Sequence, residues 1–282
     1  MQKRSYAFGM MMMVAAILSI PVAGRAQSAT SAGGQPAVIE VSPGVSATAS
    51  QAVASPPDPA RLAAAMLAYR ARASMERHKD AYEAFVSLAS DWQDDYGMQI
   101  WCARTSFYYA HRRVQADDKD GCAKVARAGS KCARRAIALR PGDYDGRYWE
   151  LMNWYKEGAT LSLVSILKSV KPIRGWLEEL IGRDPKRPEG HAFLAMAYRE
   201  LPSVVSWGDD KKALEQARIA QQLAPRDPES LLELAEALRE NGDKESAREF
   251  YGRVQTSDVP RDLEWETEDA RAWARKQLAD MD

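Results

Sequence analysis

The sequence predicts an all-α protein, a right-handed superhelix of about four irregular helix pairs with capping helices at its ends. From Arg61 onward, apolar residues recur at helical spacing, and no run has the two-residue period of a β-strand. Four helical runs are followed by a proline, at Pro141, Pro185, Pro225 and Pro260. Because proline has no N–H and its ring clashes with the preceding turn, these residues end helices at a repeating interval.

The first 26 residues have the pattern of an export signal. Basic Lys3 and Arg4 precede an apolar stretch, and the small residues Gly24 and Ala26 follow, which predicts cleavage after Ala26. The alternative is an uncleaved membrane anchor, but the apolar run is short for a spanning helix and Pro21 interrupts its end. We therefore expect a periplasmic or secreted protein.

Residues 27–58 are expected to link this signal to a helical-repeat domain at 59–282. The segment is rich in Ser, Ala, Gly, Pro and Val, and Glu40 is its single charged residue before Asp58. Such a composition has little apolar surface to bury and contains several helix breakers, so it predicts a flexible tether.

The segment 231–254 shows the repeating unit most clearly. An apolar face on a first helix is followed by a turn at Gly242 and by a facing apolar stripe on a second helix. The small Ala235 and Ala247 allow the two helices to approach closely. Earlier units at 148–185 and 191–225 repeat this arrangement with lengthened turns, and the pair Trp101–Val114 and Cys122–Leu139 is more degenerate. Helices near 60–90 and 262–280 are expected to cap the array.

Residues 97–258 resemble tetratricopeptide-repeat (TPR) proteins. Two lengthened turns look like one subgroup, the periplasmic TPR component associated with TRAP-type solute transporters (TatT-like). These are the segment from Gly146 to Pro185 and the segment Leu201-Pro202 with Trp207-Gly208. The resemblance implies pairing with a periplasmic solute-binding protein and an apolar cleft.

The residue pattern favours a binding protein over an enzyme. His78, His111 and His191 are scattered, and the sequence has no H-x-x-x-H, no G-x-S-x-G and no phosphate-binding glycine loop. It also lacks Cys/His metal spacing, so we expect no metal and no cofactor. The chain has 39 basic and 39 acidic residues, and residues 1–26 hold three of the basic ones and no acidic one. A processed chain would thus be slightly acidic, which argues against a nucleic-acid partner.

The concave side of the array is the candidate binding surface, and the first helix of each pair should line it. Helical spacing places a mixture of apolar, amide and cationic side chains there. The predicted groove residues are Trp149, Asn153, Lys156, Met196, Arg199 and Arg239. The mixture suits an acidic-hydrophobic peptide or an amphiphilic small molecule. The alternative interpretation of each residue is rim surface that carries no binding energy.

The three cysteines predict at most one intramolecular disulfide. If 101–114 and 122–139 form an antiparallel pair centred near Lys119, Cys102 and Cys132 differ by about 6 Å along the axis. Cys122 and Cys132 lie about 15 Å apart on one helix and cannot bond. A disulfide would therefore join Cys102 to Cys132, which export would favour. The alternative is three free thiols packed as small apolar side chains.

These observations together predict an exported TPR-type binding or scaffold protein that mediates protein–protein interaction in the cell envelope. The resemblance adds a role in solute uptake beside a periplasmic binding protein. The alternative is a carrier of a small amphiphilic or hydrophobic ligand in an aromatic cleft. We expect no stable membrane span after processing, because no other stretch of the sequence approaches spanning length.

Overall fold

The computed structural model describes residues 56–158, 160, 163–201, 203, 206–260 and 262–281, with 163–171 described for the backbone alone. This part of the chain is built from helices and contains no strand. The predicted export signal (1–26) and nearly all of the predicted linker (27–58) lie outside the described residues. The helices are α2 (Pro59–Arg70), α3 (Met75–Asp91), α4 (Tyr96–Gln115), α5 (Lys119–Leu139), α6 (Tyr144–Gly158), α7 (Leu163–Arg183), α8 (Pro188–Glu200), α9 (Asp210–Leu223), α10 (Pro228–Glu240), α11 (Lys244–Gln255) and α12 (Glu264–Asp280).

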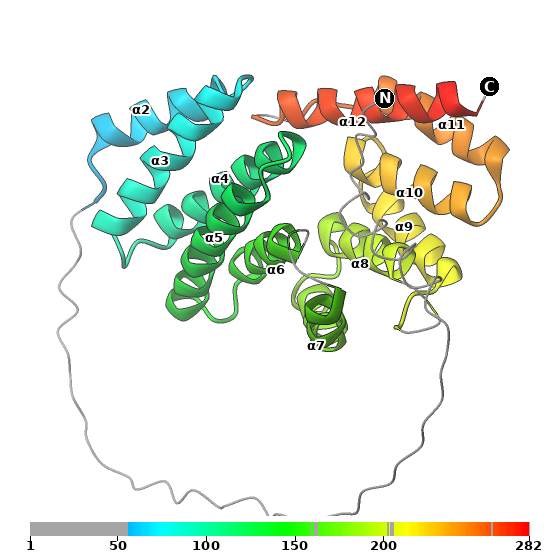
Figure 1. Cartoon of the computed structure of the whole chain (residues 1–282), viewed down its shortest axis with the longest axis horizontal. Helices are drawn as coiled ribbons and strands as arrows, with labels where there is room; N and C mark the ends of the chain where they lie inside the picture. The colour runs from blue at the N-terminus through cyan, green and yellow to red at the C-terminus, as the bar shows by residue number, and fades with distance from the viewer. Residues whose placement is uncertain are drawn as a thin grey trace, which may run out of the picture.

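Successive helices pair along an arc, which Figure 1 shows from α2 through α7 to α11. The helices α4 and α5, α8 and α9, and α10 and α11 contact each other extensively, and α6 with α7 completes the four predicted pairs. The helices α2 and α3 form a further pair at the N-terminal end of the arc. The predicted all-α superhelix is therefore confirmed.

Proline and aspartate define the helix ends. The prolines predicted to stop helices lie in the turns and loops that follow α5, α7, α9 and α11; they are Pro141, Pro185, Pro225 and Pro260. At the start of α10, Pro228 occupies the first turn and the Asp227 carboxylate accepts a hydrogen bond from the Ser230 N–H at 2.8 Å. Gly242 turns the chain between α10 and α11 with a φ of +85°, in the left-handed region that favours glycine.

Alanines lie at the closest contacts between paired helices. Ala213 and Ala217 of α9, Ala235 of α10 and Ala247 of α11 are fully buried. A side chain that stops at Cβ lets the helix axes approach, so a larger residue at these positions would push the pair apart. The alanines named in the predicted repeat pattern therefore occupy the interior of the repeats.

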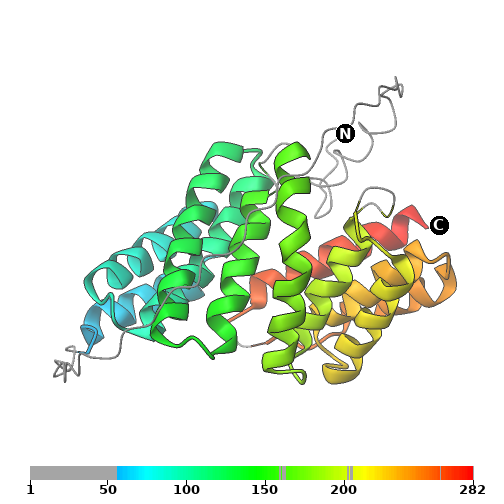
Figure 2. The ribbon, with the colours of Figure 1, turned by 90° about the horizontal axis from the view of Figure 1, so that it is seen from below.

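The last helix does more than cap the array. Figure 1 shows α12 running across the open side of the arc, from the N-terminal helices to α11, and Figure 2 shows the same helix from below. Arg72, directly after α2, forms an ion pair with Glu266 of α12 at 2.6 Å, and Arg70 pairs with Asp262 at 3.1 Å. At its other end α12 packs against α10 and α11. The expectation of a simple terminal cap is corrected, because α12 joins the two ends of the superhelix.

The structure joins Cys102 of α4 to Cys132 of α5 by a disulfide, with a Cα–Cα distance of 6.0 Å. Cys122 is buried and free, and its thiol donates a hydrogen bond to the Lys156 carbonyl at 3.4 Å. None of the helices in the described part of the chain combines the length and the apolar character needed to cross a bilayer.

Candidate functional site

The concave side holds a partly open cavity of about 200 Å³ between the arc and α12. Its walls come from the first helices of successive pairs, α4, α6, α8 and α10, and α12 forms its remaining side. Five rings from the arc form its apolar wall: Phe107, Tyr108, Tyr148, Tyr155 and Phe193. Rings carry a large apolar area and a negative face, so this wall suits an apolar ligand or an organic cation.

Carboxyl groups surround the aromatic wall. The helices α8 and α10 contribute Glu189, Glu200, Glu229, Glu233 and Glu236 to the lining. The helix α12 adds Glu266 and Asp269. The cationic lining residues are Lys156 and Arg199, so the cavity is predominantly acidic.

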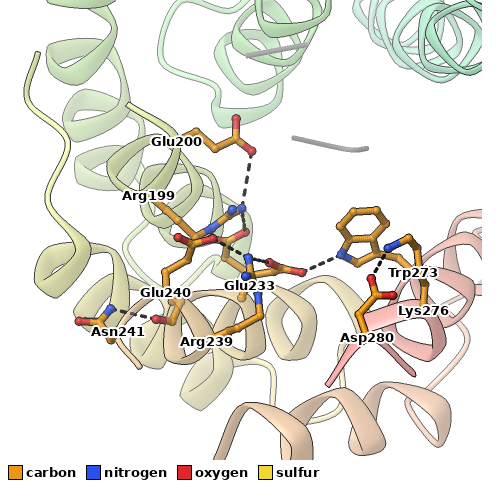
Figure 3. Close-up of polar contacts among 11 residues, drawn as sticks. Arg199, Glu200, Glu233, Arg239, Glu240, Asn241, Trp273, Lys276 and Asp280 are labelled. Carbon is orange, nitrogen blue, oxygen red and sulfur yellow. Dashed lines mark hydrogen bonds and ion pairs between the residues drawn. The ribbon is translucent and has the colours of Figure 1, made fainter. Parts of the chain in front are cut away.

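Arg199 is held at the cavity by two glutamates, as Figure 3 shows. Its Nε and Nη2 donate to the Glu233 carboxylate at 3.1 and 3.2 Å, and Nη2 lies 3.6 Å from Glu200 Oε1. The two-point contact with Glu233 fixes the guanidinium and compensates its charge. Glu200 Oε2 is buried and has no hydrogen-bond partner within the described residues. Burial raises the pKa of Glu200 to about 7, an effect that Arg199 opposes.

Lys156 takes part in a chain of polar contacts that reaches α12. Its Nζ lies 3.0 Å from His111 Nδ1, and His111 Nε2 lies 3.2 Å from Asp269 Oδ2. The ammonium therefore donates to Nδ1, and Nε2 carries the proton that Asp269 accepts. Burial, followed by the charge of Lys156, lowers the pKa of His111 well below its usual range, and burial lowers the pKa of Lys156 to about 8. The ammonium also lies over the Phe107 ring at 5.0 Å.

Glu236 is fixed by partners from two helices. The Trp273 indole N–H donates to Glu236 Oε1 at 2.7 Å, and Arg239 Nη2 donates to Oε2 at 3.1 Å. Figure 3 shows Trp273 reaching from α12 toward this cluster on α10. The side chain of Glu236 is 7% exposed, so its charge is compensated in the interior rather than by solvent.

Three of the predicted groove residues line the cavity: Lys156, Met196 and Arg199. Trp149 and Asn153 lie instead in the interior, where Trp149 packs against the Phe107 ring and the Asn153 amide donates to the Ala103 carbonyl at 2.9 Å. The predicted stripe on α6 is therefore displaced: its residues Trp149 and Asn153 pack against α4, while Lys156 lines the cavity together with Tyr148, Met152 and Tyr155.

Arg239, the last predicted groove residue, does not line the cavity. It is engaged by Glu236 and Glu240 at the C-terminal end of α10. Its guanidinium therefore lies outside the cavity lining and holds Glu236, which is part of the lining, in place.

Helical spacing had placed Glu236 on the concave face, although it was not counted among the binding residues, and the other carboxyl groups of the site were missed. Glu229, Glu233 and Glu236 follow one another at steps of four and three, the spacing that places them on one face of α10. Glu189 and Glu229 each follow the proline that begins their helix, at Pro188 and Pro228. This repeated pattern is the signal that could have identified an acidic concave face.

Within the described residues, no group of three or more His, Cys, Asp or Glu side chains is arranged to hold a metal ion. Carboxyl groups and aromatic rings surround a small apolar space in the cavity.

No family model and no curated protein sequence matches the chain. Its structure is similar to that of TTC0263, a thermophilic TPR protein of Thermus thermophilus, with a TM-score of 0.56 and 16% sequence identity over 77% of this chain and 99% of that chain. The chain therefore has a TPR fold. A MamA structure matches with a TM-score of 0.40 and 11% identity over 75% of this chain and 94% of its own. A second MamA structure matches with a TM-score of 0.38 and 14% identity over 75% and 99%.

Proposed function

We propose that this TPR-fold protein is a binding protein that holds a small ligand in its concave cavity. The observation that carries the proposal is the position of α12. In an open TPR superhelix the concave groove is free to accept a peptide along its length. Here α12 is fixed to both ends of the arc and covers that groove, leaving an aromatic-walled space of about 200 Å³. A space of that size suits a small molecule rather than a folded segment.

The proposed site of action is the cell envelope, in a protein exported after removal of residues 1–26. The basic, apolar and small-residue order of that segment supports export. The Cys102–Cys132 disulfide agrees with an oxidising compartment. A role in solute uptake beside a periplasmic binding protein, as the TRAP-associated resemblance implies, is compatible with a cavity that receives a small solute. N-terminal sequencing of protein from its native host tests export, since a chain that still begins at Met1 contradicts it.

A second candidate is a protein–protein scaffold, which the TPR fold favours. In that case the partner would contact the outer helices or the rim of the arc, because α12 covers the concave side.

Native mass spectrometry of protein purified from its own host tests the proposal. The wild type should carry a small molecule that denaturation releases. Ala192 lines the cavity, and Ala192→Trp should fill it and abolish the bound mass. The matched control is Ala272→Trp on the exposed side of α12, which should retain the ligand. A ligand-free wild type that captures a protein partner at a fixed ratio would favour the scaffold instead.

A further inference from the structure

The charges around the cavity do not balance. Arg199 compensates Glu233, and Lys156 is linked to Asp269 through His111. Three arginines outside the lining compensate three further carboxylates: Arg72 pairs with Glu266, Arg239 with Glu236 and Arg187 with Glu189. Two carboxyl groups of the lining, Glu200 and Glu229, remain without a cation of their own.

Glu200 is the buried member of this pair. Its side chain is 7% exposed, and Oε2 has no hydrogen-bond partner within the described residues. The nearby Arg199 is already engaged by Glu233 through two hydrogen bonds at 3.1 and 3.2 Å, so it compensates Glu200 incompletely. A buried carboxylate oxygen without a donor is costly, and a ligand that supplies an N–H would satisfy it.

Glu229 lies on the same lining at the start of α10. It is exposed, and its side chain forms no hydrogen bond or ion pair with the described residues. It therefore adds to the negative charge around the cavity.

We infer that the natural ligand of the cavity is an organic cation, an ammonium group on an apolar body, which pairs with Glu200 while its body contacts the aromatic wall. The inference rests on the proposed function, that the cavity holds a small ligand. Ring faces attract an ammonium group electrostatically and also bury apolar surface, so the wall serves both parts of such a molecule.

Lys156 does not make the cavity an anion site. Its ammonium donates to His111 and lies over the Phe107 and Tyr155 rings at 5.0 and 5.1 Å. Asp269, on the other side of the His111 imidazole, compensates the charge of Lys156. An anionic ligand near Lys156 would also meet the carboxylates of α8 and α10, which repel it.

Three probes of similar size and different charge test the inference: phenethylamine, which is protonated at neutral pH, phenethyl alcohol and 3-phenylpropionate. Isothermal titration of the full mature chain should show phenethylamine binding at least about tenfold more tightly than the alcohol or the acid. Glu200→Gln should weaken phenethylamine binding by about tenfold or more and leave alcohol binding within about twofold. The matched control is Glu249→Gln, an exposed carboxyl on α11, which should change neither.

A permanently charged probe, benzyltrimethylammonium, isolates the protonation of the protein. Its affinity should rise between pH 6 and 8.5, because Glu200 loses its proton in that range. The groups that face Glu200 are Tyr155, which shares a hydrogen bond with it, Arg199, Glu233, Glu236 and Lys156.

The outcomes separate this inference from the proposed function. Equal or tighter binding of the alcohol or the acid overturns the cationic ligand and leaves the cavity as a small-molecule site. Failure of all the probes to bind also overturns the inference, whereas the proposed function is judged by the mass spectrometry of Ala192→Trp. Because the Gln variants differ from Glu by one atom, circular dichroism should show an unchanged fold, and each variant is tested separately.

Discussion

Arg72→Met should release α12 from the N-terminal helices and lower the free energy of unfolding by about 3–5 kcal/mol. Arg72 is 3% exposed, donates to both oxygens of Glu266 at 3.1 and 2.6 Å, and donates to the Tyr69 carbonyl at 2.7 Å. Its guanidinium lies 3.7 Å from the centre of the Tyr69 ring. Methionine keeps part of the apolar packing and removes every one of these donors.

The magnitude comes from the carboxylate that Arg72 leaves behind. The Glu266 side chain is 11% exposed, and burial already raises its pKa against the effect of Arg72. Without Arg72 the carboxylate must remain charged and unpaired or take up a proton, and either course costs free energy. Replacing both residues removes that penalty, so the double variant Arg72→Met, Glu266→Leu should lie within about 1–2 kcal/mol of the wild type.

Urea unfolding at pH 7, followed by far-UV circular dichroism, measures these differences. The control is Arg61→Met, which breaks the exposed ion pair of Arg61 with Asp91 and should cost less than about 1 kcal/mol. A cost for Arg72→Met as small as that of the control would refute the closing role of this ion pair. So would a double variant that is as unstable as the sum of its two single variants.

Three further predictions follow from the fold and the site. Ala213→Leu and Ala247→Leu should each overpack a fully buried helix contact and cost about 1–3 kcal/mol, so unchanged thermal midpoints would contradict the packing described. In the folded protein the pKa of Glu200 is about 7, against an ordinary value of 4.5, so ionisation of Glu200 lowers the free energy of unfolding as pH rises through that window. Glu200→Gln should therefore exceed the wild type in free energy of unfolding by up to about 3 kcal/mol at pH 8 but by little at pH 4.5. An equal difference in urea titrations at both pH values would rule this out. Peptide mapping of the non-reduced protein should find Cys102 linked to Cys132 and the third cysteine free, whereas any linkage through that third cysteine would contradict the register of α4 against α5.

Much of the fold was predictable from local signals. Proline disfavours continuation of a helix, and Pro141, Pro185 and Pro225 each follow a helical run. These prolines therefore located the turns between pairs before any contact was known. The contacts at Ala213 and Ala247 were also predictable, because the close approach of two paired helices requires a small residue, and this requirement depends only on the helices of that pair. The path of α12 was not predictable, because it depends on how strongly the whole arc curves.

The site was predictable only in part. Lys156, Met196 and Arg199 were found because helical spacing fixes which residues of one helix share a face. Trp149 was misplaced, since the rotation of α6 about its axis is set by its contact with α4, which spacing does not report. The role of Glu266 depends on Arg72, a residue 194 positions away, so no local pattern reveals whether its charge is compensated.

The junction between Arg72 and Glu266 also changes how the chain can fold. In an open repeat array each unit contacts its neighbours alone, so the terminal units open first and independently. Here the first and last helices secure each other, and an opening at either end must break a contact that spans 194 residues. Closing so long a loop is entropically costly, so the junction should form late, after the repeats between its ends have ordered. The helical domain should then unfold as one cooperative unit, and its terminal helices should resist hydrogen exchange as strongly as its middle.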